Sequence, residues 1–396
     1  MSLSTAIPLL RLFAGLVGRV PAGHLAYLAR QLRKEKPHVF RGQLRINSFF
    51  PPFPSLAFDR FRSAMIARRR APYSTYIAVT GQCPYRCPHC SYARRGPGEL
   101  AREKLLEVVR EVKALGTATL GLTGGEPLLR PDLEDLVAAA GPEMATILFT
   151  TGHGLDRARA ARLARAGLGC VTIGIEAAEA TVHDQTRGER GSFAEAAAAA
   201  DACREAGLYM ALSTVGTREK LADGGLERMY ALAEAWGARE FRILPPAATG
   251  GWTGCEDVML TPEDRAALAR FHAAHNRRRS GPAVAAVGWL ESDAMFGCGA
   301  GYHHLFIDAA GEVCPCDLAP LSFGSVADEP LAAIWDRMAA RFPVPRKACV
   351  ARSVAAKLVG ETLPLARGKS EAITAAPGEE DKLPEVYRRL LDNGKR

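Results

Sequence analysis

The sequence predicts an α/β protein built on a parallel sheet. Six apolar, β-type runs between residues 76 and 244 alternate with segments whose apolar residues recur at helical spacing. Cysteine- and glycine-rich stretches directly follow the first two runs, where parallel β/α proteins place their chemistry. After about residue 285 the pattern changes to a hairpin with a cysteine at each end. The six strand–helix units are fewer than the eight of a closed barrel.

Residues 1–71 form a basic extension ahead of the first predicted strand. Residues 1–70 contain 13 Lys/Arg and 2 Asp/Glu, a balance of +11 in a chain whose formal charge is +8. The remaining residues therefore sum to −3, so the basicity belongs to this segment alone. Such a charge can attract phosphates, but the chain shows no RNA-reading motif, and no nucleic-acid partner is expected.

Most of the extension is predicted to be helical. Residues 7–20 are apolar but too short to span a bilayer, and Arg11 interrupts them. Residues 1–40 could lie in a membrane interface, with cations near anionic headgroups. Equally, they could pack on the next domain as an ordinary helical extension. The aromatic, proline-rich residues 49–54 are predicted to form an extended strap or lid over a cavity.

The second domain, residues 72–285, carries the strand–helix repeats. Its strand candidates are residues 76–80, 119–123, 146–150, 171–176, 209–214 and 241–244. The first intervening helix has one apolar face, made of Leu105, Val108, Val109, Val112 and Leu115.

Three cysteines with the spacing C-x3-C-x2-C, Cys83, Cys87 and Cys90, follow the first predicted strand. Thiolates hold iron–sulfur clusters, and a [4Fe–4S] cluster has four irons, so three ligands leave one iron open. An open iron lets a cluster bind a substrate-like molecule. The alternative is a structural zinc site that also uses His89, but it gives no role to the motif after the second strand.

That second motif is Gly124-Gly125-Glu126-Pro127, directly after the second predicted strand. Glycine lacks a Cβ, so Gly124 and Gly125 allow the backbone to approach a ligand closely. Glu126 offers a carboxylate to an ammonium group.

The two motifs together resemble the signature of the radical S-adenosylmethionine (SAM) superfamily. The resemblance implies a partial (β/α)6 barrel of the TIM type, with a [4Fe–4S] cluster on Cys83, Cys87 and Cys90. It further implies that SAM chelates the open iron and that Gly124–Pro127 receive its methionine amine. One electron, from a flavodoxin- or ferredoxin-type reductant, would then cleave SAM to a 5′-deoxyadenosyl radical that abstracts hydrogen from a C–H bond.

Two further strand ends supply candidate cofactor contacts, Glu176 and Thr214. Glu176 and the later His183-Asp-x-x-Arg187 run resemble a family stretch in which serine is usual where Gly174 stands. A hydroxyl contact with SAM is therefore not expected at Gly174. Ordinary polar residues at a barrel mouth remain an alternative for both positions.

The second cysteine group lies in residues 286–350. Cys298 and Cys316 flank a predicted hairpin that turns near Gly311. This pattern, with Cys349 following, resembles the SPASM/twitch extension of radical SAM enzymes. The resemblance implies one auxiliary [4Fe–4S] cluster, because the cysteine run for a second one is absent. Its implied ligands are Cys298, Cys316 and Cys349, with Cys314 as the favoured fourth and Cys255 in reserve. The alternative is that Cys314 is a free thiol, and with only three ligands the fourth iron could hold substrate.

Residues 351–396 form a C-terminal tail, with a predicted linker at 375–382 and a short amphipathic helix at 383–391. The chain has ten dispersed cysteines and no secretory signal. This combination favours a reducing cytoplasm over a disulfide scaffold, with peripheral placement at the membrane if residues 1–40 bind lipid.

The leading functional hypothesis is a radical SAM oxidoreductase that acts on a C–H bond of a lipid or isoprenoid substrate. The basic, apolar extension and the aromatic strap suggest that substrate. The alternatives are a ribosomally made peptide and a small metabolite. A hypothesis of another class is a non-catalytic iron–sulfur electron carrier, which would bind no SAM.

Overall fold

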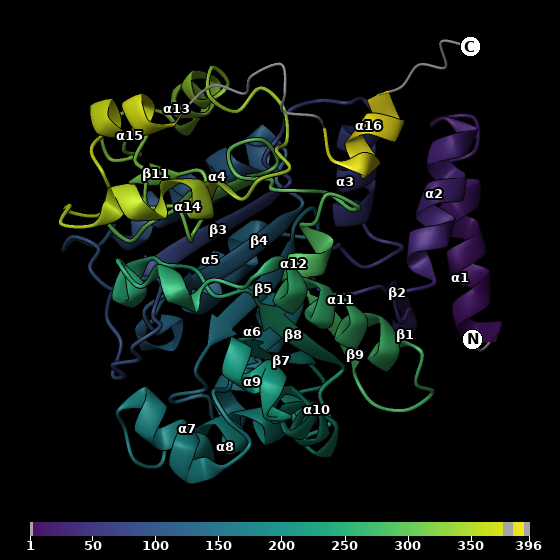
Figure 1. The fold of residues 1–396 in the computed structure, drawn as a ribbon, viewed down its shortest axis with the longest axis horizontal. Coiled ribbons are helices and arrows are strands. Elements are labelled where there is room, and N and C mark those ends of the chain that lie inside the picture. Colours follow the sequence, from purple (N-terminus) through teal and green to yellow (C-terminus); the bar gives the residue numbers. More distant parts are fainter. Residues whose placement is uncertain (1–2, 375–382, 392–396) are drawn as a thin grey trace.

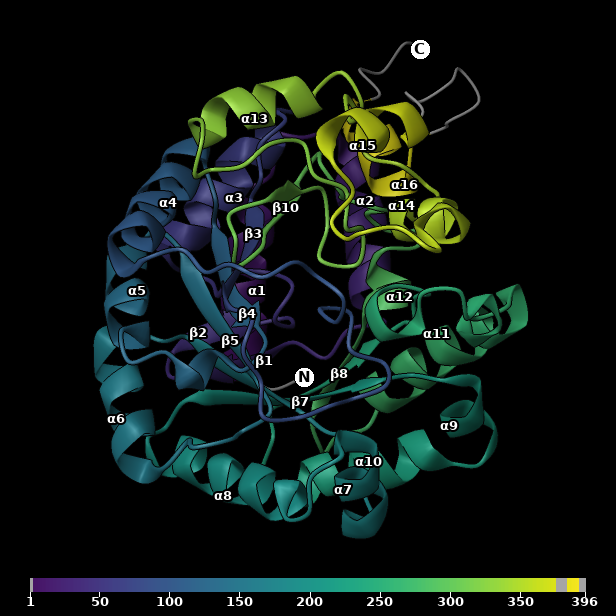
Figure 2. The same cartoon turned by 90° about the vertical axis from the view of Figure 1, so that its left-hand side faces the viewer.

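The computed structural model describes residues 3–374 and 383–391. Its core is a nine-stranded sheet in the order β11-β10-β3-β4-β5-β6-β7-β8-β9. All neighbouring strands are parallel except β10 and β11, which form an antiparallel hairpin. Figure 2 looks into the curved sheet, with α4, α5, α6, α8 and α10 forming an outer layer around it. This is the predicted open β/α barrel.

The strands are β3 (Ser74–Thr80), β4 (Thr119–Gly124), β5 (Ala145–Thr150), β6 (Cys170–Gly174), β7 (Tyr209–Val215), β8 (Glu240–Leu244), β9 (Ala283–Ala286), β10 (His304–Ile307) and β11 (Val313–Cys314). The helices of the barrel are α4 (Arg102–Leu115), α5 (Leu133–Ala140), α6 (Arg157–Ala166), α7 (Ala180–Arg187), α8 (Ser192–Glu205), α9 (Arg218–Ala222), α10 (Gly225–Ala235), α11 (Pro262–Asn276) and α12 (Val287–Leu290). The six predicted strands correspond to β3–β8.

Helix α4 shows why these segments form their elements. Its buried residues, Leu105, Val108, Val109 and Val112, are those of the predicted apolar face. The helix ends at Gly116, whose φ of 105° is a left-handed conformation that glycine adopts without steric cost. The apolar face packs on the sheet and aligns the strands whose ends carry the cysteine loop.

The C-terminal hairpin does not form a separate sheet. Strand β10 pairs in parallel with β3, through the register Phe306 to Tyr76. Without β10, strand β3 would be an edge strand with unpaired backbone groups. The small C-terminal region, which continues into α13 (Leu331–Met338), α14 (Val350–Val354) and α15 (Arg367–Ile373), is therefore continuous with the barrel sheet.

The N-terminal extension contains α1 (Leu3–Ala14), α2 (Ala22–Leu32), a small hairpin of β1 (His38–Phe40) and β2 (Gln43–Arg45), and α3 (Leu56–Ile66). Figure 1 shows α1 and α2 side by side at one end of the molecule. The C-terminal helix α16 (Glu385–Leu391) packs against α2. The predicted linker, residues 375–382, lies outside the described residues.

The predicted strap lies at the amino-terminal end of the barrel, where Phe50 lines a cavity. The amide and hydroxyl of Ser48 both donate to the carboxylate of Glu240, each at 2.6 Å, and Glu240 is the first residue of β8. The cysteine loop leaves the carboxyl end of β3, so the strap and the loop occupy opposite ends. Among the described residues, no helix has the length and apolarity needed to cross a bilayer.

Candidate active site

The cysteine loop is held at the mouth of the barrel by two other segments. The amide of Arg86 donates to the carbonyl of Arg187 at 3.0 Å, and the amide of Gly251 donates to the carbonyl of Cys90 at 2.9 Å. A Cβ on Gly251 would lie 2.2 Å from the carbonyl oxygen of Pro88. The turn after β8 therefore fits against the loop only because glycine stands there.

All three cysteines of this loop line one cavity of about 1180 Å³. Burial raises the pKa of the Cys83 thiol to about 11, so a metal that binds there must displace a proton. Burial also raises the pKa of the Cys87 thiol, while the guanidinium of Arg187, with Nη1 at 3.5 Å from Sγ, opposes that shift. Arg187 thus favours the thiolate form of Cys87.

Gly124 and Gly125 line the same cavity beside the thiols, but their backbone also packs on the cysteine loop. The amide of Gly125 donates to the carbonyl of Thr80 at 2.8 Å. A Cβ on Gly125 would lie 2.0 Å from the carbonyl oxygen of Gln82, and one on Gly124 would lie 2.2 Å from that of Thr80. The two glycines therefore fit the second motif against the first.

Glu126 differs from its predicted role. It is 0% exposed and its carboxylate accepts four hydrogen bonds, from the amides of Leu128 and Thr151 and the hydroxyls of Thr150 and Thr151. These bonds fix the end of β4 to the end of β5. The structure does not direct this carboxylate toward an ammonium group in the cavity. Pro127 is buried as the first residue of a short 3-10 helix, η1 (Pro127–Leu129).

Glu176 and Thr214 both line the cavity, as predicted. The side chains of Arg187 and Lys220 contact them. Although burial alone would raise the pKa of Glu176, Arg187 at 2.8 Å and His89 at 3.2 Å hold it well below its usual range. The ammonium of Lys220 donates to the Thr214 hydroxyl at 2.8 Å. Glu176 is therefore a buried anion that holds Arg187 and His89 in the cavity wall next to the cysteine loop.

The second cysteine group gathers behind the opposite wall of this cavity. The thiols of Cys298 and Cys349 are hydrogen-bonded to each other, which lowers the pKa of Cys349 to about 6. The Cys316 thiol lies 3.4 Å from Oδ1 of Asp317. Asp317 also lines the cavity that contains the first three thiols. The cavity therefore extends from the first three thiols to Asp317, which lies between it and Cys316.

Comparison with known proteins agrees with this arrangement. The family model described as "Radical SAM superfamily" matches residues 77–224, and the SPASM model, described as "Iron-sulfur cluster-binding domain", matches residues 298–349. The chain belongs to the radical SAM superfamily. It is a radical SAM enzyme with a C-terminal SPASM domain, and it uses SAM and iron–sulfur clusters as cofactors.

Two curated relatives are similar to this chain over about two thirds of its length. PqqA peptide cyclase of Granulibacter bethesdensis is 29% identical over 278 residues, covering 67% of this chain and 74% of that protein. AdoMet-dependent heme synthase of Methanosarcina barkeri is 25% identical over 297 residues, covering 69% and 84% respectively.

Solved structures share the fold at lower identity. Streptococcus suis SuiB bound to S-adenosylmethionine aligns with a TM-score of 0.57 and 15% identity over 70% of each chain. Native anSMEcpe with bound AdoMet aligns with a TM-score of 0.53 and 16% identity, over 76% of this chain and 95% of that one. These likenesses support the radical SAM barrel.

The residues of the barrel mouth fit the two radical SAM cofactors. Three thiols converge from one loop, the paired glycines leave room beside them, and the cavity continues past Glu176 and Thr214. His89, which a zinc site would use as a fourth ligand, is bonded to Glu176 instead. Cys83, Cys87 and Cys90 therefore lie together as a cluster loop requires, and Gly124, Gly125 and Thr214 line the space beside them.

The SPASM domain brings together three of its four predicted ligands. The thiol of Cys314 lies 3.6 Å from Nη1 of Arg95, in an apolar cluster with Phe306. Strand β11 ends at Cys314, so Cys316 belongs to the following turn and does not share its direction. Cys314 therefore has different neighbours from the other three thiols, and its role as the fourth ligand stays a prediction. Cys255, the reserve candidate, lies in the loop after β8, at the start of η3 (Glu256–Val258).

A carboxylate and an imidazole lie next to the thiol of Cys316. Potential ligand atoms of His304, Cys316 and Asp317 all lie within 4.8 Å of one another. The sequence analysis considered only cysteines for this position. The adjacency of Asp317 to Cys316 was the available signal, whereas the approach of His304 depends on the pairing of β10 with β3.

Proposed function

We propose that this radical SAM enzyme removes a hydrogen atom from a C–H bond of a peptide or small-metabolite substrate. The cavity at the cysteine loop carries this proposal, because it extends to Asp317, the neighbour of Cys316, so a substrate there would lie close to both cysteine groups. When bound, the cluster and SAM supply a carbon-centred radical that attacks unactivated C–H bonds. A flavodoxin- or ferredoxin-type protein is the proposed electron donor.

The relatives favour a peptide as the first candidate. One curated relative is a PqqA peptide cyclase, and SuiB has been solved with its precursor peptide. The heme synthase relative keeps a small metabolite as the second candidate. The cavity wall also carries charged side chains, Glu176, Arg187 and Asp317, which suit polar substrates.

The lipid or isoprenoid substrate loses its structural support. That hypothesis rested on the basic extension and the aromatic strap, and both lie at the amino-terminal end of the barrel. The cysteine loop lies at the carboxyl end. A chain bound near the strap would be separated from the loop by the sheet and its buried polar residues, such as Arg242 and Glu240.

The residues of the cavity have distinct proposed roles. Arg187 stabilises the Cys87 thiolate, and Glu176 fixes Arg187 and His89 in place. Among the described hydrogen bonds, Lys220 is the only cationic side chain that donates to the Thr214 hydroxyl. Asp317, on the far wall, is placed to orient a substrate or to bind the auxiliary cluster.

Reductive SAM cleavage tests the enzymatic proposal. Protein reconstituted anaerobically with iron and sulfide is given dithionite and SAM, and 5′-deoxyadenosine is measured by mass spectrometry. We expect product from the wild type, none from Cys87→Ala, and continued product from Cys316→Ala. An iron-loaded wild type that forms no 5′-deoxyadenosine would favour the electron-carrier hypothesis instead.

The substrate class needs a separate experiment. Peptide and metabolite extracts of a strain lacking the gene are compared with those of its parent by mass spectrometry. A peptide whose mass differs between the strains supports the first candidate, and a changed small molecule supports the second. Deuterium transfer from the labelled compound into 5′-deoxyadenosine would then identify the attacked C–H bond.

We also propose that the protein works in the cytoplasm and contacts the membrane peripherally through residues 1–40. Helix α1 exposes Leu3 (81%), Leu10 (70%) and, just beyond its end, Val17 (67%). These positions follow a helical repeat and form a stripe that faces solvent. Exposed apolar helix faces with nearby cations are typical of interfacial helices. Flotation with vesicles containing anionic lipid tests the contact, and failure of the full-length protein to float would remove it.

A further inference from the structure

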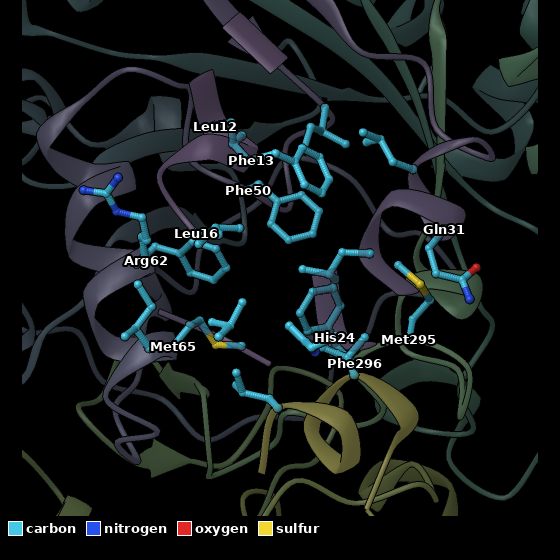
Figure 3. A pocket seen from close by; sticks show the side chains of 18 of the residues that line it. Leu12, Phe13, Leu16, His24, Gln31, Phe50, Arg62, Met65, Met295 and Phe296 are labelled. Carbon is cyan, nitrogen blue, oxygen red and sulfur yellow. The ribbon is translucent and has the colours of Figure 1, made fainter. Parts of the chain in front are cut away.

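A second cavity lies beneath α1, at the end of the molecule away from the cysteine loop. It contains about 940 Å³ of empty space, part of which is open to solvent, and its walls come from α1, α2, α3 and α16, together with Phe50 of the strap and Phe296. Figure 3 shows these side chains surrounding an open space. Among the described residues, none lines both this cavity and the one at the barrel mouth.

The lining of this cavity is that of an apolar ligand site. Protein interiors pack densely and leave few voids larger than a water molecule. Small-molecule sites are predominantly apolar. This cavity is lined almost entirely by aliphatic and aromatic side chains, for example Leu12, Phe13 and Met65. Such a lining attracts apolar molecules.

Two polar atoms in the wall have no partner within the described structure. They are Nδ1 of His24 and Oε1 of Gln31, from side chains that are 4% and 6% exposed. His24 and Gln31 are seven residues apart on α2 and therefore share one face of that helix. Burial lowers the pKa of His24 to about 4, so its imidazole is neutral at physiological pH. Neither atom has accessible surface in the cavity, and Figure 3 shows the Gln31 amide directed away from the open space, so a ligand would be held by the apolar walls.

Helix α1 and the turn after it form the outer wall of this cavity and are apolar on both faces. Leu12 and Leu16 face the cavity, whereas Leu10 and Val17 point outward. The first 34 residues contain five Lys/Arg and no acidic residue. This charge suits an anionic bilayer and would repel a second copy of the same segment. A bilayer at the outer face of α1 would place acyl chains next to the cavity.

We propose that the cavity between α1, α2, α3 and α16 binds the hydrocarbon chain of a membrane lipid. The hydrocarbon chain lies along the apolar walls. Because the site is at the opposite end of the barrel from the cysteine loop, the lipid is not the substrate of the radical reaction. It anchors and orients the enzyme at the membrane, whichever substrate the barrel mouth takes.

The test uses the fluorescent fatty acid cis-parinaric acid without vesicles, excited directly, and the full-length reconstituted protein. We expect saturable binding by the wild type. Leu16→Trp fills the cavity and should weaken binding by about tenfold or more. Val17→Trp is the matched control, because the same side chain is added at the next residue, which points to solvent; it should bind like the wild type.

Iron content and melting temperature show whether each variant is folded. Leu28→Trp repeats the test from the α2 wall, so a folding failure of one variant does not decide the outcome. Equal binding by the wild type and by a folded cavity-filling variant would overturn the proposal, as would a folded wild type that binds no fatty acid. Vesicle flotation separates this site from membrane contact: Leu10→Glu should lose flotation and keep fatty-acid binding.

Discussion

Individual residues of the two radical SAM motifs show how similar side chains acquire different roles. Glu126 and Glu176 are both buried carboxylates near the cysteine loop. Glu126 accepts hydrogen bonds from uncharged donors and joins two strand ends. Glu176 is paired with Arg187 and His89, and it lines the cavity. The sequence motif identified both positions, but only the partners distinguish structural support from a site residue.

Replacing Glu126 by glutamine tests its structural role. The amide group presents a donor to the donors of Thr150 and Thr151, so a buried hydrogen bond is lost. We expect Glu126→Gln to lower the free energy of unfolding by about 1–3 kcal/mol, as measured in urea with metal-free protein. If stability is unchanged while SAM binding disappears, Glu126 contacts SAM as the motif originally predicted.

Removing the Arg187 guanidinium tests the anion that it holds. The folded-state pKa of Glu176 is depressed, so its stabilising contribution is present above the unfolded pKa and is lost as pH falls through the folded pKa. Arg187→Ala should therefore cost about 3 kcal/mol at neutral pH. The difference from wild type should shrink toward pH ~3, where the unfolded state is protonated. Urea unfolding of metal-free protein at both pH values measures this, and a pH-independent difference would contradict it.

Matched substitutions of Cys314 and Cys316 test which of the two binds the auxiliary cluster. Cys314 and Cys316 are two residues apart, but only Cys316 lies with Cys298 and Cys349. We expect Cys316→Ser to lower bound iron by about one cluster per chain and Cys314→Ser to retain it. Asp317→Ala should change the electron paramagnetic resonance spectrum of the reduced auxiliary cluster if the carboxylate is a ligand. Loss of iron in Cys314→Ser would support the original ligand prediction instead.

At the scale of elements, periodicity predicted the helices and strands that bury one continuous apolar face. The apolar run before Cys83 and the face of α4 are visible in the sequence because side-chain spacing follows backbone geometry. The addition of β9 and β10 to the sheet cannot be seen in the sequence, because it depends on which edge strands of the folded sheet are still unpaired. The strap shows the same limit. Its residues predicted an extended cover, but only the hydrogen bond from Ser48, just before the strap, to Glu240 shows which end of the barrel it covers.

The turn after β8 illustrates an element contact that sequence reasoning missed. A Cβ at Gly251 would collide with the Pro88 carbonyl in the cysteine loop. We expect Gly251→Ala to displace the loop and reduce cluster loading, measured as iron and sulfide per chain. Gly96→Ala is the control, because a Cβ there meets nothing within 4 Å. Equal iron loading in both variants would show that the loop tolerates this shift.

At the scale of the whole molecule, the barrel has a different cavity at each of its two ends. The carboxyl end gathers the cysteine loop, Glu176 and Asp317 around one polar cavity. The amino-terminal end carries the strap, the cavity beneath α1 and the basic surface. Sequence reasoning joined these features into one lipid substrate hypothesis, because a sequence does not state which end of a barrel each segment reaches.

This separation predicts that the two ends can be altered independently. Leu10→Glu with Val17→Glu places two anions on the outer face of the first helical segment, where they would be repelled by anionic lipid. The double variant should therefore lose flotation with anionic vesicles. Neither residue lines the cavity at the barrel mouth, so 5′-deoxyadenosine formation without vesicles should stay within about twofold of wild type. Loss of SAM cleavage in a folded double variant would mean that the extension and the cysteine loop are coupled through the barrel.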